Sequence, residues 1–320
     1  MRYVTVLITL RNNVSTIKQC IDSLLKIDYP KYRIMVVDAF SNDGSYEALK
    51  SYGKKIDLYQ VKGWAPTAYN WALKKIESEY IALVDGDCVV PNDWLTELMK
   101  GFTSPDVVEV AGRMLTPKTT NKLQEAIGLD LEDRYANLGD SISKVPTMNV
   151  AFKTSMAKNV RFNEKLRVGY DADFSFRLTK FGKIKYVPDA VMFHHHRATW
   201  KALFRQQYIT ASMMPTLYWK HKSKISGDSI SRPSMIAQPF LAYGFLLSLM
   251  VSIFRPSFYI VPAFSLALLL AIYIIDTLSV SRKAQQVPWL LGFYFVRTIG
   301  WCAGLMPGTI NILKEILRKN

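Results

Sequence analysis

Two acidic residues, one apart, follow an apolar run of the chain. Asp85 and Asp87 flank Gly86 and come directly after the segment Tyr80-Ile81-Ala82-Leu83-Val84. An apolar run of this length is typical of a buried strand, so both carboxylates would lie at one edge of a sheet. Carboxylate oxygens suit hard divalent cations such as Mg²⁺ and Mn²⁺, which in turn bind diphosphates. The pattern therefore predicts a site in which a cation holds a nucleoside diphosphate; a strand followed by an ordinary acidic turn is the alternative.

Strand-like and helix-like segments alternate around this motif with short connections. Strands are expected over 4–10, 33–37, 56–61 and 80–84, helices over 14–25, 46–51, 67–76 and 91–102, and later strands over 107–113 and 145–152. This alternation predicts an α/β fold with a mostly parallel sheet and helices on both faces. Ligands of such sheets bind beyond the carboxyl ends of the strands. Thr9, Asp38 and Asp85 lie at or near those ends, so we expect them to converge on one edge.

Two more acidic residues and a histidine triplet lie further along the chain. Asp171 and Asp173 precede a short amphipathic helix, and His194-His195-His196-Arg197 follow a strand expected over 185–193. A carboxylate in front of a helix can take a proton from an attacking hydroxyl. Imidazole is a common ligand of Mn²⁺-like ions. A capping or orienting role for Asp173 and a solvated histidine triplet are the alternatives.

The composition divides the chain into a mixed part and an apolar part. Residues 1–205 combine charged and apolar residues as a soluble domain does, whereas 236–310 are dominated by Leu, Ile, Phe, Ala and Val. The formal net charge of +15 suits anionic lipid head groups, a phosphorylated substrate or nucleic acid. The apolar part favours the first two partners, and the sequence carries no nucleic-acid recognition motif. Cys20, Cys88 and Cys302 are far apart, with no metal-ligand spacing, which fits a reducing compartment.

Three apolar stretches are long enough to cross a bilayer, which takes about 20 residues. They cover Ala237 to Phe254, Phe258 to Val280 and Pro288 to Ile310. Basic residues precede the first stretch and follow the second: Lys220, Lys222, Lys224, Arg232, Arg282 and Lys283. Since cytoplasmic flanks are enriched in Lys and Arg, we expect a multi-pass cell-membrane protein whose soluble domain is cytoplasmic.

The third stretch and the segment before the first stretch allow two interpretations each. Arg297 lies within the third stretch and is expected either to face a lipid phosphate, or else to snorkel to the interface or pair with Asp276. We therefore expect two to three membrane helices. The segment 198–224 interleaves aromatic and basic residues, which is typical of an interfacial amphipathic helix, and a plain packing helix is the alternative.

An ordered set of motifs resembles the membrane-anchored branch of the inverting family 2 glycosyltransferases, which have the GT-A fold. The matching segments are Val6 to Asn12, Val36 to Ser45, Gly63 to Asn70, Asp85 to Asp87, Asn149 to Phe152, Gly169 to Leu178, His194 to Arg197 and Arg205 to Gln207. The resemblance runs from residue 4 to about residue 210, and the order of the motifs carries it. Three positions depart from the family pattern, namely Ala39, Tyr69 and Tyr170.

The resemblance and the chemistry of sugar transfer imply roles for individual residues. On the donor side, Asp87 is expected to bind the metal directly with His194 as a further ligand, and Asp85 to contact the ribose or the sugar. Thr9 and Asp38 are expected at the base, with ordinary strand-end caps as the alternative. Arg197 and Arg205 are expected to pair with phosphate oxygens; contact with lipid head groups is their alternative. On the acceptor side, Asp171 is the expected catalytic base, with Asn149 and Asp173 nearby.

These expectations define a function and a domain plan. We expect a metal-dependent transferase, using Mn²⁺ or Mg²⁺, that moves a single sugar from a nucleoside diphosphate sugar to a polyprenyl phosphate or other lipid-linked acceptor at the cytoplasmic face. The expected domains are a catalytic GT-A domain over 1–205, an amphipathic juxtamembrane segment over 206–235 and a membrane domain over 236–320.

Three other functions compete with this interpretation. A processive polysaccharide synthase would carry a Gln-X-X-Arg-Trp signature, of which Gln206-Gln207-Tyr208 is only a faint echo. A sugar nucleotidyltransferase would carry a Gly-rich segment where Arg11-Asn12-Asn13 stands. A non-catalytic membrane scaffold is disfavoured because the acidic residues of the expected site are present.

Overall fold

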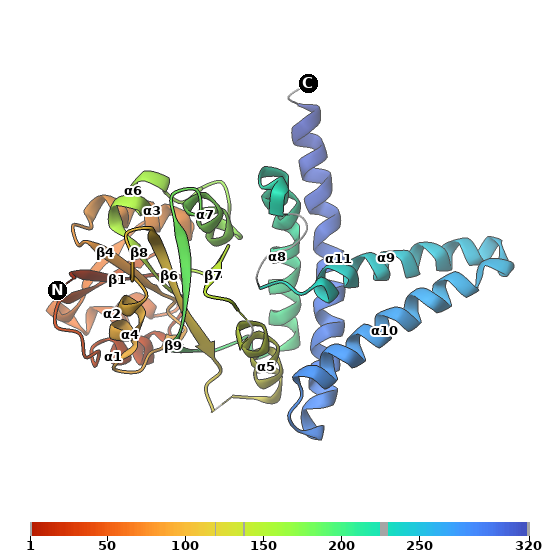
Figure 1. Ribbon diagram of the computed structural model, residues 1–320, viewed down its shortest axis with the longest axis horizontal. Helices are drawn as coiled ribbons and strands as arrows, with labels where there is room; N and C mark the ends of the chain where they lie inside the picture. The colour runs from red at the N-terminus through yellow and green to blue at the C-terminus, as the bar shows by residue number, and fades with distance from the viewer. Residues whose placement is uncertain (1, 119, 137, 225–229, 319–320) are drawn as a thin grey trace. The chain divides into compact units, whose positions relative to one another are not determined.

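The computed structural model describes residues 2–118, 120–136, 138–224 and 230–318. The chain divides into two compact units, each with its own architecture (Figure 1). The first unit contains residues 1–117 and 137–195, and the second contains residues 118–136 and 196–320. The chain enters the second unit after His195, and the segment 118–136 groups with the C-terminal helices. The domain limits expected from the sequence stay predictions.

Among the described residues, nine strands of the first unit form one sheet in the order β3-β2-β1-β4-β8-β6-β9-β5, with β7 paired to β9. The strands are β1 (Val4–Leu10), β2 (Tyr32–Asp38), β3 (Asp57–Gln60), β4 (Tyr80–Val84), β5 (Cys88–Val89), β6 (Val107–Leu115), β7 (Ser141–Ile142), β8 (Asn149–Lys153) and β9 (Lys183–His194). Strands β1 to β4 pair in parallel, as do β6 and β9, while the pairings of β5, β7 and β8 are antiparallel. The predicted α/β class is confirmed.

Helices cover both faces of this sheet (Figure 1). They are α1 (Ile17–Leu24), α2 (Ser45–Lys50), α3 (Ala65–Lys75), α4 (Trp94–Lys100), α6 (Thr154–Val160) and α7 (Tyr170–Leu178). Val6 and Ile8 of β1 pack in one buried cluster with Ile21 of α1 and Leu95 of α4. Because helices bury both faces of the sheet, β1 and β4 are almost continuously apolar rather than alternating.

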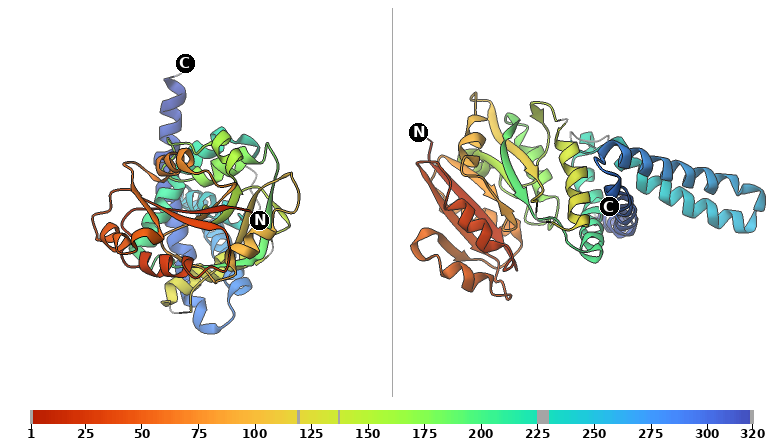
Figure 2. Two further views of the ribbon diagram at one scale, coloured as in Figure 1. Left: turned by 90° about the vertical axis from the view of Figure 1, so that its left-hand side faces the viewer. Right: turned by 90° about the horizontal axis from the view of Figure 1, so that it is seen from below.

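The second unit is helical. It contains α5 (Lys122–Ala136), α8 (Trp200–Lys220), α9 (Pro233–Phe254), α10 (Ile260–Val280) and α11 (Val287–Leu317). Helices α9 and α10 form a long hairpin, whereas α8 and α11 lie side by side and run across the direction of that hairpin (Figures 1 and 2). In the described part of the chain, three helical segments are long and apolar enough to cross a membrane: Pro233–Phe254, Pro256–Val280 and Ala284–Lys314.

Close contact between α8 and α11 depends on glycine. A Cβ atom at Gly304 would lie 2.2 Å from the carbonyl oxygen of Tyr208, and one at Gly308 would lie 2.4 Å from that of Ser212. Any larger residue would push the two backbones apart. Small residues are enriched where apolar helices pack this closely.

Arg297 of α11 takes a partner that the sequence did not indicate. Its side chain is 2 % exposed, and its guanidinium donates to Asp130 of α5 at 3.4 Å and to Gln238 of α9 at 3.1 Å. The guanidinium is therefore not at the surface of the described residues, and it forms no hydrogen bond with Asp276 there. The Asp276 carboxylate instead accepts a hydrogen bond from Gln238 at 3.1 Å. Burial alone would raise the pKa of the Asp130 carboxyl, but the guanidinium of Arg134 and those of Arg297 and Arg232 lower it. A polar network therefore joins α5, α9, α10 and α11 inside the second unit.

Candidate active site

The carboxyl ends of the parallel strands meet at one edge of the sheet. Leu10 at the end of β1 lies opposite Asp38 of β2, and β4 ends directly before Asp85. Strand β6 runs in the same direction as β4, because both pair antiparallel with β8, and β9 runs parallel to β6. The end of β9 therefore reaches this edge too. The predicted site residues that the first unit brings to this edge are Thr9, Asp38, Asp85, Asp87 and His194.

Three different ligand atoms lie close together at this edge. His194 Nε2 is 3.5 Å from Asp87 Oδ1, and Cys88 Sγ is 3.9 Å from the same oxygen. Ligand atoms of the three residues all lie within 4.8 Å of one another. Carboxylate, imidazole and thiol groups at this separation are a donor set for a divalent cation. The residues at this edge thus fit a bound metal ion.

The loop that carries Asp85 and Asp87 is held from two sides. The Thr16 hydroxyl, at the start of α1, donates to the Gly86 carbonyl at 2.9 Å. The backbone N–H of His195 donates to the Asp87 carbonyl at 3.1 Å. These bonds hold the backbone of the loop to the start of α1 and to the end of β9, and neither uses a side-chain oxygen of Asp85 or Asp87.

Two tyrosines, Tyr69 buried and Tyr170 half-buried, lie close to both Asp85 and Asp171. The rings of Tyr69 on α3 and Tyr170 on α7 have centroids 6.1 Å apart. The pKa of each phenol is raised, first by burial and then by negative charges that include both Asp85 and Asp171. The charges of Asp85 and of the predicted base Asp171 thus act on both tyrosines. All four side chains therefore lie in one region of the first unit. These are two of the three positions that depart from the pattern of the resemblance.

Asp171 lies in the first turn of α7, which follows a left-handed turn at Gly169. Gly169, with φ of 75°, adopts a conformation that disfavours side chains and lets the helix start at Tyr170. Asp171 is half-buried, and one of its oxygens accepts the backbone N–H of Ala172 at 2.8 Å. Burial raises the pKa of the Asp171 carboxyl, and the Lys144 charge opposes the rise only in part. A carboxylate with a raised pKa accepts a proton more readily near neutral pH.

Other predicted site residues have side chains engaged within the fold. Both oxygens of Asp38 accept bonds, from the Ser41 backbone N–H at 3.0 and 3.3 Å and from Gln60 at 3.0 Å. Asp173 is buried and pairs with Arg177 at 2.7 Å, which anchors α7. The Asp38 bonds shape the turn after β2, which favours the strand-end role for that residue. The predicted ligand roles of both residues stay predictions.

Asn149 of β8 joins three elements. Its side-chain oxygen accepts from the Trp94 indole at 2.8 Å, and its amide donates to the carbonyls of Arg113 at 2.9 Å and Ala190 at 3.0 Å. These bonds give Asn149 a structural role in tying α4, β6 and β9 together. Its acceptor-side role stays a prediction.

Arg197 and Arg205 belong to the second unit, before and on α8, and both are exposed. Their expected contacts with donor phosphates stay predictions.

Comparison with known proteins identifies the family. Residues 5–165, half of the chain, match the sequence profile described as glycosyl transferase family 2. The chain belongs to this family. The family 2 resemblance seen in the order of the motifs is thereby confirmed.

Relatives of this family 2 protein share moderate identity with it. The pre-mycofactocin glycosyltransferase of Mycobacterium tuberculosis is 28% identical over 260 residues, which cover 76% of this chain and 53% of the relative. The poly-beta-1,6-N-acetyl-D-glucosamine synthase of Staphylococcus epidermidis is 24% identical over 204 residues, covering 59% and 48%. The chain therefore spans about half the length of these curated relatives.

A solved structure shares the fold. The mannosyltransferase PcManGT from Pyrobaculum calidifontis, in complex with GDP-Man and Mn²⁺, superposes with a TM-score of 0.58 at 16% identity. The match covers 94% of this chain and 87% of that one. The predicted GT-A fold followed by apolar helices is confirmed.

Three residues near the site of this family 2 protein were not among those predicted from the sequence. The linear spacing of the cysteines shows no metal-ligand pattern, but pairing of β5 with β9 brings Cys88 opposite His194. Glu109 is buried in β6, and the negative charge of Asp171 helps to raise the pKa of its carboxyl. The positive charge of Lys144 lowers the pKa of the Asp171 carboxyl. Only adjacency to Asp87 could have drawn attention to Cys88.

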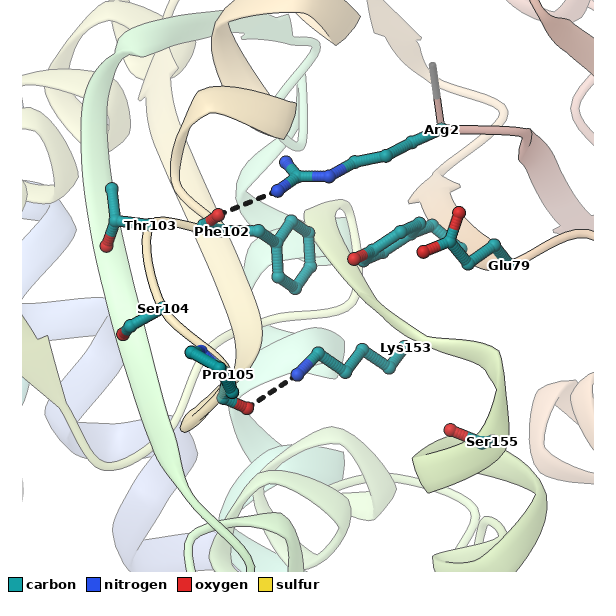
Figure 3. Close-up of a pocket in the computed structure, with 9 residues that line it drawn as sticks. Arg2, Glu79, Phe102, Thr103, Ser104, Pro105, Lys153 and Ser155 are labelled. Atoms are coloured by element: carbon teal, nitrogen blue, oxygen red, sulfur yellow. Dashed lines mark hydrogen bonds between the residues drawn. The ribbon is translucent and has the colours of Figure 1, made fainter.

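A cavity of about 480 Å³ lies at the opposite edge of the sheet, where β1 and β4 begin (Figure 3). Two cations line it, and both are already bound. Arg2 donates to the carbonyls of Met99 at 2.6 Å and Phe102 at 2.9 Å, and Lys153 donates to that of Pro105 at 2.6 Å. The cavity is therefore distant from the carboxyl edge and offers no convergent set of ligand groups.

Glu109 predicts a pH dependence of stability. Burial raises the pKa of this carboxyl from 4.5 to about 8, with Asp171 adding to the rise and Ser175 opposing it. The folded state therefore holds a proton that the unfolded state releases, so the contribution of Glu109 to stability is complete below about pH 4.5 and is lost as the pH rises to about 8. We expect Glu109→Gln to remove this loss, a change of at most a few kcal/mol, since one pKa unit corresponds to about 1.4 kcal/mol.

Thermal unfolding of the wild type, Glu109→Gln and Glu77→Gln at about pH 5 and about pH 9 tests this linkage. Glu77 is exposed and serves as the matched control. A wild-type protein that loses no more stability between the two pH values than Glu109→Gln would contradict the buried, protonated state of Glu109.

Proposed function

We propose that this protein is a divalent-cation-dependent inverting glycosyltransferase that moves one sugar from a nucleoside diphosphate sugar to a lipid-linked acceptor at the cytoplasmic membrane face. One observation carries the proposal: Asp87 and His194 approach to 3.5 Å at the carboxyl edge of a family 2 fold, and the charges of both Asp85 and Asp171 act on the Tyr69–Tyr170 pair. Two solved structures of similar fold, PcManGT in complex with GDP-Man and Mn²⁺ and GalNAc-T7 with UDP, GalNAc and Mn²⁺, support a cation at this edge.

The donor side uses the carboxyl edge. Asp87 and His194 would hold Mn²⁺ or Mg²⁺, which when bound neutralises charge that gathers on a leaving diphosphate. Asp85, half-buried beside them, is suited to accept hydrogen bonds from the ribose or sugar. Thr9 and Asp38 flank the nucleoside end, where Asp38 shapes the turn through its bonds to Ser41.

The acceptor side uses Asp171. As a hydroxyl attacks the anomeric carbon opposite the leaving group, the Asp171 carboxylate takes its proton, and the configuration at that carbon inverts. The raised pKa of Asp171 brings the carboxyl closer to the pH at which the proton must move. With an acceptor phosphate, which is already anionic, Asp171 would orient the nucleophile instead.

A processive synthase is the second candidate, because the relative from S. epidermidis is named a polysaccharide synthase. The Gln-X-X-Arg-Trp signature of processive enzymes is missing from the sequence, and the partly similar segment Gln206-Gln207-Tyr208 makes a structural contact instead. Gln207 accepts a hydrogen bond from the Trp301 indole at 2.8 Å, which ties α8 to α11. Transfer of a single sugar is therefore the better-supported mode.

Membrane attachment is proposed through the α9–α10 hairpin. Its distal half is apolar and bare, with Ile253, Phe254 and Phe264 respectively 72%, 85% and 69% exposed. Exposed apolar surface of this extent suits lipid contact. Helix α11 runs across the hairpin beside α8 (Figure 2), and its exposed apolar residues form one stripe: Phe295, Ile299, Met306, Ile310, Leu313 and Leu317. We therefore place α8 and α11 in the cytoplasmic interface rather than across the bilayer.

Asp171→Asn is expected to lower turnover by about 10²-fold or more, with donor affinity unchanged, because the amide cannot accept the proton. Steady-state turnover and binding of nucleoside diphosphate sugars would be measured on the same preparations. Asp189→Asn is the control, since Asp189 is an exposed carboxylate of β9. Loss of donor affinity with turnover preserved at saturation would remove Asp171 from the role of base.

The arrangement of the helices can be tested with single cysteines and a membrane-impermeant maleimide on intact cells, with the wild type as background. Ser257→Cys, in the hairpin turn, should react from outside, whereas Lys283→Cys should react only after permeabilisation. Arg318→Cys, after α11, should behave like Lys283→Cys. Labelling of Arg318→Cys in intact cells would mean that α11 spans the membrane.

A further inference from the structure

We propose that Cys88 is a third ligand of the cation site and gives it affinity for thiophilic divalent ions such as Zn²⁺ and Cd²⁺, which would compete there with Mn²⁺ or Mg²⁺. The inference rests on the proposed function only in that Asp87 and His194 hold a cation. No such role follows from the linear positions of the cysteines, since Cys88 has no second cysteine at ligand spacing.

The distances suit one small ion. Cys88 Sγ and His194 Nε2 lie 3.9 and 3.5 Å from Asp87 Oδ1, and all three ligand atoms fall within 4.8 Å of one another. Tetrahedral Zn²⁺ with bonds of about 2.0–2.3 Å holds its ligand atoms about 3.3–3.8 Å apart. Only small adjustments of the side chains would bring all three atoms into contact with the same ion.

The backbone holds the three residues in place. Cys88 lies directly opposite His194 in the antiparallel pair of β5 and β9, so their side chains leave the same face of the sheet. Asp87 precedes Cys88, and its carbonyl accepts the N–H of His195. Cys88 is fully buried and His194 is 9% exposed. The donors are thus presented by paired strands and not by a flexible loop.

The chemistry of the thiol sets the preference. Carboxylate oxygen alone suits hard cations, whereas sulfur selects softer ions such as Zn²⁺ and Cd²⁺. On binding, the S–H bond breaks, the electron pair on sulfur forms the bond to the ion, and the proton passes to the solvent. No oxidant or reductant is needed. Three protein ligands leave a fourth position of a tetrahedral ion open.

Titration of the purified protein with Cd²⁺ tests the proposal, because a cadmium–thiolate bond gives an ultraviolet charge-transfer band that needs no glycosyl transfer. We expect one such band per chain in the wild type. Cys88→Ser and Cys88→Ala should abolish it and lower Cd²⁺ affinity by at least about tenfold, the loss seen when even indirect partners of a metal are removed. Cys20→Ser and Cys302→Ser should keep it.

Mn²⁺ binding, followed by electron paramagnetic resonance on the same variants, separates this inference from the function on which it rests. Cys88→Ser is expected to retain Mn²⁺ and to lose only the cadmium band. A wild type that binds Mn²⁺ but gives no band, or a band that survives in both Cys88 variants, would overturn the role of Cys88 alone. A wild type that binds neither ion would overturn both the role of Cys88 and the proposed cation site.

Discussion

The pairing of β5 with β9 is the constraint on which the rest of the site depends. It consists of two residue pairs, Cys88 with His194 and Val89 with Phe193, yet it brings the end of the sheet's longest strand against the Asp85–Asp87 loop. Without it, the imidazole and the carboxylate would belong to separate strand ends. The hydrogen bond from His195 N–H to the Asp87 carbonyl reinforces this pairing from the backbone.

On the side of the site proposed for the acceptor, burial raises the pKa values of ionisable groups. Burial raises the pKa of both the Asp171 and the Glu109 carboxyl, and the negative charge of Asp171 raises the pKa of Glu109 further. The pKa values of Tyr69 and Tyr170 are also raised, first by burial and then by negative charges that include Asp85 and Asp171. Removing these carboxyls from water costs stability, and a raised pKa suits Asp171 to accept a proton on the side proposed for the acceptor.

Sequence reasoning could predict the elements but not the contacts between distant segments. The alternating apolar runs predicted the strands, and strands that run in parallel must share a carboxyl edge, so the meeting of Asp38 and Asp85 followed from local pattern. The partners of Cys88 and Arg297 could not be predicted in this way. The partner of Arg297 is Asp130, 167 residues away on a helix that the sequence assigned to the catalytic domain, and the neighbour of Cys88 depends on which strand β5 joins. The apolar periodicity of a single segment does not indicate either of these long-range contacts.

The central claim is that Asp87, with His194, holds a nucleoside diphosphate through a divalent cation. Thermal stability of the wild type, Asp87→Ala and the exposed-site control Asp93→Ala, measured with a panel of nucleoside diphosphate sugars with and without Mn²⁺, tests it most directly. A specific sugar nucleotide at a hundredfold excess over its Kd should stabilise the wild type and Asp93→Ala by about 2.7 kcal/mol, only when Mn²⁺ is present. Equal stabilisation of Asp87→Ala, or stabilisation of the wild type that ignores Mn²⁺, would contradict the account.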